Sequence, residues 1–209
     1  MARLPLVIYP DDILVRRSTD VTEIDQALVD FVMAMRETMY TSNGIGLAAP
    51  QVAQNIRVVT IDVEPDEGGK KFLHLINPVI LDSHGKTTYD EGCLSFPGLT
   101  AEVKRKKEVH VQAYDLNGKL LDFEADGLLA ICVQHELDHL NGITFVDRLS
   151  PVQRTLVVRD YLRRREDEEH DDQIDRIIAV HRVESRSEPT ARPASAPEDT
   201  TVTNAATRP

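Results

Sequence analysis

One short stretch, AICVQHELDHLNG at residues 130–142, restricts the fold of this chain more than any other. It begins as an apolar run and then brings together four ionisable side chains, those of His135, Glu136, Asp138 and His139. The apolar residues surround the axis of the helix that they would form, which leaves little room for a solvated face. Burying charged groups without partners is costly, and a bound cation offsets that cost. We therefore expect a buried helix that carries a metal site.

The two histidines have the spacing of metal ligands. His135 and His139 are four residues apart, so at about 100° per residue they share one face of a helix. Two neutral imidazoles at this spacing can bind one divalent cation, with Glu136 beside them as general base, which is the H-E-x-x-H pattern of metalloproteases. The alternative is a chance match on a surface helix, which the preceding apolar residues disfavour.

A catalytic metal site of this type needs a third protein ligand and one open position. The extended motif H-E-x-x-H-x-x-G-x-x-H would place a histidine at position 145, where this chain has Phe145, which cannot bind a metal. The downstream acids Glu166 and Glu169 lie in a highly charged segment that is better explained as solvated surface. Neither alternative supplies a convincing third ligand.

The two cysteines differ in their separation from the histidines. Cys132 lies seven residues before His139. That separation is about 10.5 Å of helical rise, too far for two groups that share one ion at bonds of about 2.1–2.3 Å. Cys93, in DEGCLSFPG at residues 90–98, is left as the candidate third ligand. Its alternative role is that of a small buried hydrophobic residue.

The segment NGIGLAAPQ, residues 43–51, is a candidate for the opening of the site. It has the G-x-G-x-x-A form of a dinucleotide loop, but it follows a helix where that fingerprint requires a strand. One interpretation is a plain structural loop. The functional interpretation is that Gly44 and Gly46 let the backbone come close to a ligand, while Gln51 offers an amide N–H to an oxyanion.

The order of the predicted elements indicates an α+β fold. Asn77-Pro78 interrupts the second strand, Asn117-Gly118 predicts a type I′ hairpin turn, and Val152 and Leu156 are expected on the inward face of the last helix. The expected elements are a helix at 22–39, strands at 56–63 and 72–81, a strand and hairpin at 101–125, a helix at 126–140 and a helix from Pro151 onward.

Composition and charge exclude several classes of protein. The 209 residues carry a formal net charge of −11, which disfavours a large basic surface for nucleic acid. Two cysteines give no disulfide framework, and the start of the chain has no signal peptide or membrane-spanning run. We therefore expect a cytoplasmic protein. A charge run follows Arg163, and from Ser185 the composition predicts a disordered tail.

Three segments together resemble the signature motifs of the peptide deformylase family, in order and in spacing: GIGLAAPQ at 44–51, EGCLS at 91–95 and QHELDHL at 134–140. The early YPDDIL and the DGLLAICVQHE lead into the third motif are also similar to that family. The resemblance implies antiparallel β-sheets packed around a central buried helix that carries the HExxH motif, with a C-terminal helix. It assigns 1–163 to the catalytic domain and leaves 164–209 as a charged, then low-complexity tail.

The resemblance also implies an activity, namely removal of the formyl group from N-formylmethionyl nascent peptides with release of formate. A hydroxide on the metal would attack the formyl carbon. The implied metal is Fe²⁺, and Zn²⁺, Ni²⁺ or Co²⁺ can substitute. The matching positions are Cys93, His135 and His139 as metal ligands, Glu136 as general acid/base, Gln51 and the backbone N–H of Leu94 as oxyanion site, and Glu91 with Arg105 as a supporting ion pair.

The methionine side chain of such a substrate needs an apolar pocket beside the metal. Leu128 and Ile131 share the metal-binding face of the buried helix, and we expect them, with Ile45 and the two glycines Gly44 and Gly46, to line that pocket. The alternative role of the three apolar residues is plain core.

The expected partners are N-formylmethionyl peptides and the ribosome near its exit tunnel. We expect a monomer with no nucleic-acid specificity and no membrane association. Two rival functions follow from the same motif. A general zinc peptidase is disfavoured by the missing third histidine. A structural zinc site is disfavoured by the retained Glu136 and the open fourth position.

Overall fold

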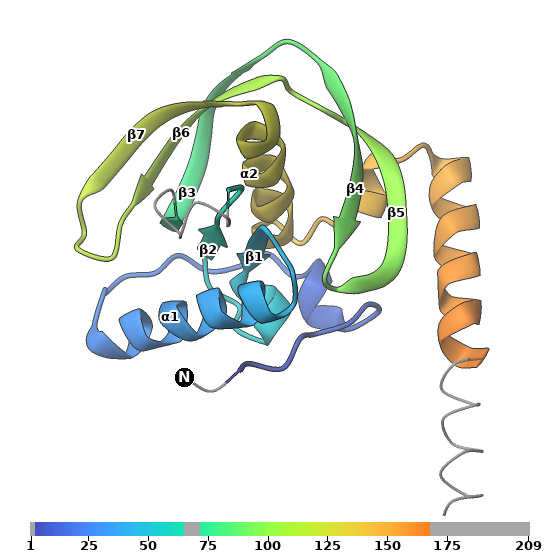
Figure 1. Ribbon diagram of the computed structural model, residues 1–209, viewed down its shortest axis with the longest axis horizontal. Coiled ribbons are helices and arrows are strands. Elements are labelled where there is room, and N and C mark those ends of the chain that lie inside the picture. The colour runs from blue at the N-terminus through green and yellow to red at the C-terminus, as the bar shows by residue number, and fades with distance from the viewer. Residues whose placement is uncertain (1–2, 65–71, 168–209) are drawn as a thin grey trace, which may run out of the picture. The chain divides into compact units, whose positions relative to one another are not determined.

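The structure, a computed structural model, describes residues 3–64 and 72–167 (Figure 1). Contacts within the chain divide it into two units, Met1–Leu162 and Arg163–Pro209. Most of the predicted tail, including Glu169, lies outside the described residues, so its disorder and the domain boundary stay predictions.

The predicted helices and strands occur in the expected order, and the structure adds strands at 46–48 and 87–93 that were not predicted. Its helices are η1 (Asp12–Val15), α1 (Gln26–Thr41), η2 (Ala49–Val52), α2 (Gly127–Leu140) and η4 (Phe145–Arg148). Its strands are β1 (Gly46–Ala48), β2 (Val58–Ile61), β3 (Leu73–His84), β4 (Thr87–Cys93), β5 (Phe96–Arg105), β6 (Glu108–Tyr114) and β7 (Leu120–Asp126). A further helix begins at 151 and is helical through 167.

The strands form two antiparallel sheets around one helix. The larger sheet has the order β1-β2-β3-β6-β7, and β4 pairs with β5 in a separate two-stranded ribbon. Figure 1 shows α2 lying between the larger sheet and the ribbon. Every residue of α2 from 130 to 140 is buried. The predicted α+β fold, with a central buried helix and a C-terminal helix, is therefore confirmed.

The apolar side of α2 builds the main core. Val133, Leu137 and Leu140 pack in one cluster with side chains of the larger sheet, among them Val59 and Val111. Burial of each such side chain stabilises the fold by about 1.5–3 kcal/mol. This packing fixes the rotation of α2 about its axis, so its polar residues must face other neighbours.

A buried arginine secures the end of α2. Arg57 donates hydrogen bonds to the backbone oxygens of Leu140 (3.3 Å) and Pro78 (3.0 Å) and to Oδ1 of Asn141 (3.1 Å). The bond to Leu140 satisfies a carbonyl at the helix C-terminus that has no partner within the helix, and the bond to Pro78 links that end of the helix to β3. The predicted interruption at Asn77-Pro78 is a register irregularity inside β3, with Asn77 at φ 51°.

The hairpin turn between β6 and β7 differs from the predicted type I′ form, which requires positive φ at both central residues. Gly118 has φ 74°, but Asn117 is not in the positive-φ region. The Asp115 carboxylate accepts hydrogen bonds from the backbone N–H groups of Asn117 and Lys119. The backbone carbonyl of Asp115 accepts a hydrogen bond from the N–H of Gly118. This side-chain bonding favours a three-residue loop that ends in a left-handed glycine.

The prediction of which residues face inward on the last helix is also wrong. Val152 and Leu156 are exposed, by 71% and 45%. Tyr161 is buried instead, and its ring centroid lies 5.4 Å from that of Phe96. Val157 and Val158 pack in the same cluster. The face of the helix that carries Tyr161 therefore packs against the rest of the first unit.

Candidate metal centre and adjoining cavity

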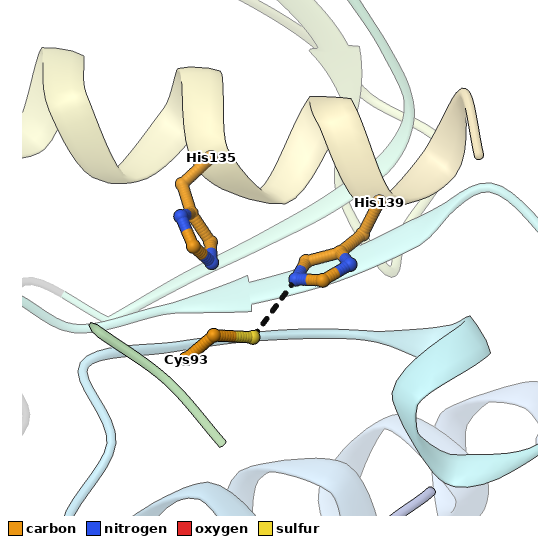
Figure 2. Close-up of side chains that lie close together, drawn as sticks. All are labelled: Cys93, His135 and His139. Carbon is orange, nitrogen blue, oxygen red and sulfur yellow. Dashed lines mark hydrogen bonds between the residues drawn. The ribbon is translucent and has the colours of Figure 1, made fainter. Parts of the chain in front are cut away.

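Three predicted ligands lie together at the centre of the first unit. Figure 2 shows His135 and His139 projecting from α2 toward Cys93, at the end of β4. One ligand atom from each residue lies within 4.8 Å of the others, and Cys93 Sγ is 3.2 Å from His139 Nε2. The helical spacing of the histidines and the end of the β4-β5 ribbon thus bring a thiol and two imidazoles to one point.

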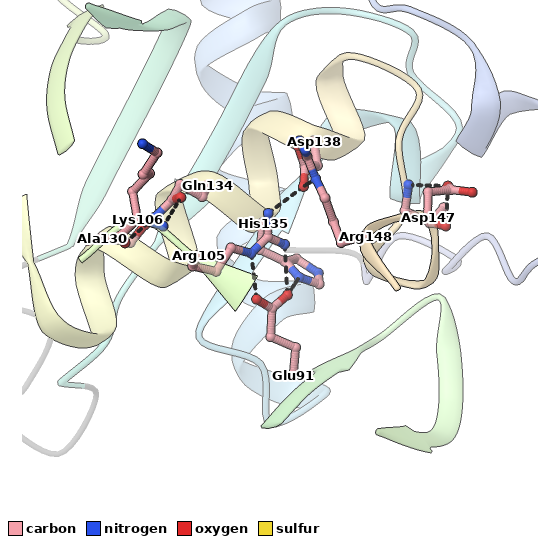
Figure 3. A network of polar contacts seen from close by, with 10 residues as sticks. Glu91, Arg105, Lys106, Ala130, Gln134, His135, Asp138, Asp147 and Arg148 are labelled. Carbon is pink, nitrogen blue, oxygen red and sulfur yellow. Dashed lines mark hydrogen bonds and ion pairs between the residues drawn. The ribbon is translucent and has the colours of Figure 1, made fainter. Parts of the chain in front are cut away.

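Glu91 orients one of these histidines. Its Oε2 lies 2.8 Å from His135 Nδ1 (Figure 3). The other ring nitrogen, Nε2, then faces Cys93 and His139 (Figure 2). Burial lowers the pKa of His135, but its hydrogen bonds to Cys93 and Glu91 outweigh burial and raise the pKa well above its usual range. Burial and the neighbouring His135 hold the pKa of His139 well below its usual range.

A network of buried ion pairs contacts His135 through Glu91 (Figure 3). Arg105 donates from Nε and Nη2 to the two oxygens of Glu91, at 2.6 and 2.8 Å, and from Nη1 to Asp138 at 2.5 Å. Arg148 also donates to Asp138. Burial alone would raise the pKa of Glu91, but the bonds from Arg105 and His135 lower it to about 2. Glu91 is therefore charged at neutral pH.

Glu136 faces the cavity beside the ligands and is 4% exposed. Its Oε2 has no hydrogen-bond partner among the residues that the structure describes. Burial raises its pKa from 4.5 to about 7, partly opposed by the neighbouring His135. A carboxyl group with such a pKa can both accept and donate a proton near neutral pH.

Gly46 explains how Glu136 fits against β1. A Cβ atom at position 46 would lie 2.3 Å from Oε1 of Glu136 and 2.7 Å from Sγ of Cys132. Gly44 has a comparable role, since a Cβ there would lie 2.8 Å from Cδ1 of Leu94. The close approach that these glycines permit in the structure is to other side chains. Their predicted approach to a ligand stays a prediction.

Gln51 is held in one orientation. Its side chain is buried, and Oε1 accepts the backbone N–H of Ala48 at 2.8 Å. The amide nitrogen, Nε2, therefore points the other way, 3.4 Å from Sγ of Cys93 and 3.3 Å from Oγ of Ser95. The predicted N–H donor is thus beside the predicted metal ligands.

A cavity of about 740 Å³ opens beside this centre. Apolar and glycine residues that were predicted to contact a substrate line it together. The predicted residues on its wall are Gly44, Ile45, Gly46, Gln51, Glu91, Cys93, Leu94, Leu128, Ile131, His135 and Glu136.

The residues present suit a divalent transition-metal ion. A thiol and two imidazoles are the ligand types that bind Zn²⁺ and Fe²⁺, and their ligand atoms converge within 4.8 Å. Phe145, where the extended motif would have histidine, instead packs its ring 6.1 Å from that of His135. Two of these three residues, Cys93 and His135, also line the cavity.

Sequence reasoning missed three side chains that complete this region. Asp138 was recognised as ionisable but received no partner, and Arg148 and Ser95 received no role. A buried acid three residues after His135 on the same helix should have suggested a nearby cation. The identity of that cation depended on long-range contacts, because Arg105 is 33 residues from Asp138 in the chain.

Comparison with known proteins gives one family. The family described as Polypeptide deformylase matches residues 3–155. A peptide deformylase of Thermodesulfovibrio yellowstonii is 47% identical over 156 residues, which are 75% of this chain and 94% of that protein.

Solved structures give the same result. A peptide deformylase from Legionella pneumophila is similar with a TM-score of 0.75 and 38% identity, covering 80% of this chain and 98% of that one. A peptide deformylase from Synechococcus elongatus in complex with actinonin is similar with a TM-score of 0.72 and 41% identity, covering 75% and 86%. Among the residues that the structure describes, none of the helices combines the length and apolar character needed to cross a membrane.

The two cysteines provide a test of the ligand set. Cys93→Ser replaces a soft sulfur ligand with a hydroxyl and should sharply weaken zinc binding, measured by competition with a chromophoric chelator. Cys132→Ser should keep the metal, because burial holds the pKa of the Cys132 thiol well above its usual range and the thiol is neutral. The buried hydroxyl should cost about 1–2 kcal/mol in unfolding free energy. Full zinc affinity in Cys93→Ser, with loss in Cys132→Ser, would overturn the assignment.

Proposed function

The chain belongs to the polypeptide deformylase family, a family of hydrolases, and on that premise we propose that it removes the N-formyl group from N-formylmethionyl nascent peptides and releases formate. The observation that carries the proposal is the convergence of Cys93, His135 and His139 beside Glu136 at the wall of one cavity.

Cys93, His135 and His139 are proposed to hold the metal. Fe²⁺ is the proposed native ion, with Zn²⁺, Ni²⁺ or Co²⁺ able to replace it, since a mixed sulfur and nitrogen ligand set accepts all four. When bound, the ion supplies Lewis-acid chemistry that makes water a better nucleophile near neutral pH. The hydrogen bond from His135 to Glu91 keeps the ring in one tautomer and orientation.

Glu136 is proposed to transfer the proton. It accepts a proton from the water molecule that attacks the formyl carbon, and it then delivers the proton to the amine that leaves. Its buried position supports this role, because burial raises its pKa to about 7 and brings proton acceptance and donation into the same pH range.

Gln51 and the backbone N–H of Leu94 are proposed to stabilise the negative charge that develops on the formyl oxygen. The fixed amide of Gln51 supports this role, since its oxygen is occupied by Ala48 and its nitrogen faces the site. A donor that needs no reorientation is most effective in the transition state.

The substrate's methionine side chain is proposed to lie against Ile45, Leu128 and Ile131. All three line the cavity together with Glu136, and Gly44 and Gly46 lie on the same wall. The proposed partners are nascent peptides near the ribosomal exit tunnel, in the cytoplasm, with the enzyme acting as a monomer.

The reaction is tested by measuring formate released from a formyl-Met peptide by the metal-loaded protein. Glu136→Gln should keep the metal, because Glu136 is not a ligand, and should lose about 10²–10⁴-fold in kcat because the amide cannot accept the proton. Glu102→Gln, an exposed change on β5, is the matched control. Turnover by Glu136→Gln equal to that of the parent at equal metal content would exclude the assigned role. Absence of formate release by the loaded parent would contradict the proposed reaction.

Gln51→Leu tests the oxyanion site. The change should lower kcat by about 10²-fold and leave KM nearly unchanged, because it removes a donor used mainly in the transition state. Gln54→Leu, at an exposed position nearby, should have no effect. A change in KM alone would make Gln51 a substrate-binding residue.

A further inference from the structure

A second cleft, of about 1000 Å³, borders a different face of α2. Its helix residues are Gln134, Leu137 and Asp138, at the i, i+3 and i+4 positions of one stripe. The metal-side cavity is bordered instead by Ile131 and His135. The helix therefore separates two hollows with different linings.

The second cleft is strongly basic in a chain of net charge −11. Its described lining includes one acidic residue, Asp138, which is already paired with two arginines. The basic residues on its wall are Arg17, Arg57, Lys86, Lys104, Arg105, Lys106 and Arg148. An excess of one charge within a concave surface raises the local concentration of counter-ions.

Internal ion pairs account for only part of this charge. Arg57 lies near Asp20, and Arg105 and Arg148 belong to the network that contains Asp138. The other four basic side chains are exposed, and none of them forms an ion pair with a carboxylate in the described part of the chain. These four, named here the free cations, are Arg17, Lys86, Lys104 and Lys106.

The free cations come from separate segments that the fold brings to one cleft. Arg17 follows η1, Lys86 lies between β3 and β4, and Lys104 pairs with Thr88 across the ribbon. Two hydrogen bonds to Gln134 fix the backbone of Lys106 (Figure 3). Its N–H donates to Oε1 of Gln134 and its carbonyl accepts from Nε2, both at 2.9 Å. Like charges gathered in this way destabilise the fold slightly, so an anionic ligand would relieve their repulsion.

We propose that this cleft binds consecutive phosphate groups of an oligoanion. Three of the free cations are lysines, whose compact ammonium groups suit phosphate oxygens, and the hydroxyls of Thr87 and Thr88 on the same wall add neutral donors. Because the charges are spread over several segments, they match a row of phosphate groups better than they match a single phosphate group. The phosphates can belong to a free oligophosphate or to the backbone of a single-stranded RNA. The proposal does not depend on the deformylase reaction.

Binding is measured directly, on the full chain, with two probes. A fluorescein-labelled single-stranded RNA of about 12 nucleotides is followed by anisotropy, and inorganic tripolyphosphate is followed by calorimetry. For four phosphate contacts, RNA affinity should fall roughly 50-fold between about 50 and 200 mM salt, a slope near 0.7 per contact. Binding of RNA alone identifies nucleic acid as the source, and binding of both probes identifies the phosphate row itself.

Charge reversals locate the site. Lys104→Glu and Arg17→Glu, on separate segments of the cleft wall, should each weaken binding by about tenfold and lower the salt slope. Lys119→Glu is the matched control, because Lys119 is exposed in the β6–β7 turn and lies outside the cleft. Circular dichroism and melting temperature establish that all three variants fold.

Three results would overturn the proposal. The first is that neither phosphate probe binds at low salt. The second is that Lys119→Glu weakens binding as much as the cleft variants do, which would mean nonspecific attraction. The third is that an oligo-glutamate peptide of similar charge binds as tightly as RNA, with the same dependence on Lys104, which would assign the cleft to acidic peptides instead.

Discussion

The buried ion pair between Glu91 and Arg105 is the interaction on which the site depends. One guanidinium binds a carboxylate from β4 and another, Asp138, from α2, so it joins the ribbon to the helix. Separating such partners would leave charges buried without compensation, at a cost of about 3–5 kcal/mol. The same Glu91 carboxylate accepts from His135. The contact that attaches the ribbon therefore also orients His135, a proposed metal ligand, and brings Cys93, two residues after Glu91, to the histidines.

Helix α2 borders both the metal-side cavity and the basic cleft, because its faces carry different side chains. Its apolar side fills the main core, one polar face carries the proposed metal ligands and Glu136, and another borders the basic cleft. A side chain at position 46 of β1 would collide with Glu136 and Cys132 of this helix, and glycine avoids that collision. Among the ionisable groups of the central stretch, His135 bonds Glu91, Asp138 pairs with arginines and His139 lies beside Cys93, whereas Glu136 faces the cavity.

Sequence reasoning found those features that depend on local periodicity. The spacing of His135 and His139 defines a shared face in any helix, and elimination then left Cys93. Features set by distant contacts were missed or wrong. The partner of Asp138 could not be read from its own segment, and the inward face of the last helix was decided by how Tyr161 packs against Phe96. The hairpin turn was decided by the Asp115 side chain, which the Asn-Gly signal does not include.

We propose that the buried Glu91–Arg105 pair holds the proposed metal ligand His135 in place, and the zinc dissociation constant of Glu91→Gln tests this most directly. The variant keeps the shape of the side chain but loses the charge that binds Arg105 and His135. Loss of such a supporting group should weaken zinc binding by about 10–100-fold, while Asp90→Asn, an exposed change on the same strand, should bind zinc like the parent. Zinc affinity in Glu91→Gln equal to that of the parent, in a folded protein, would contradict the account.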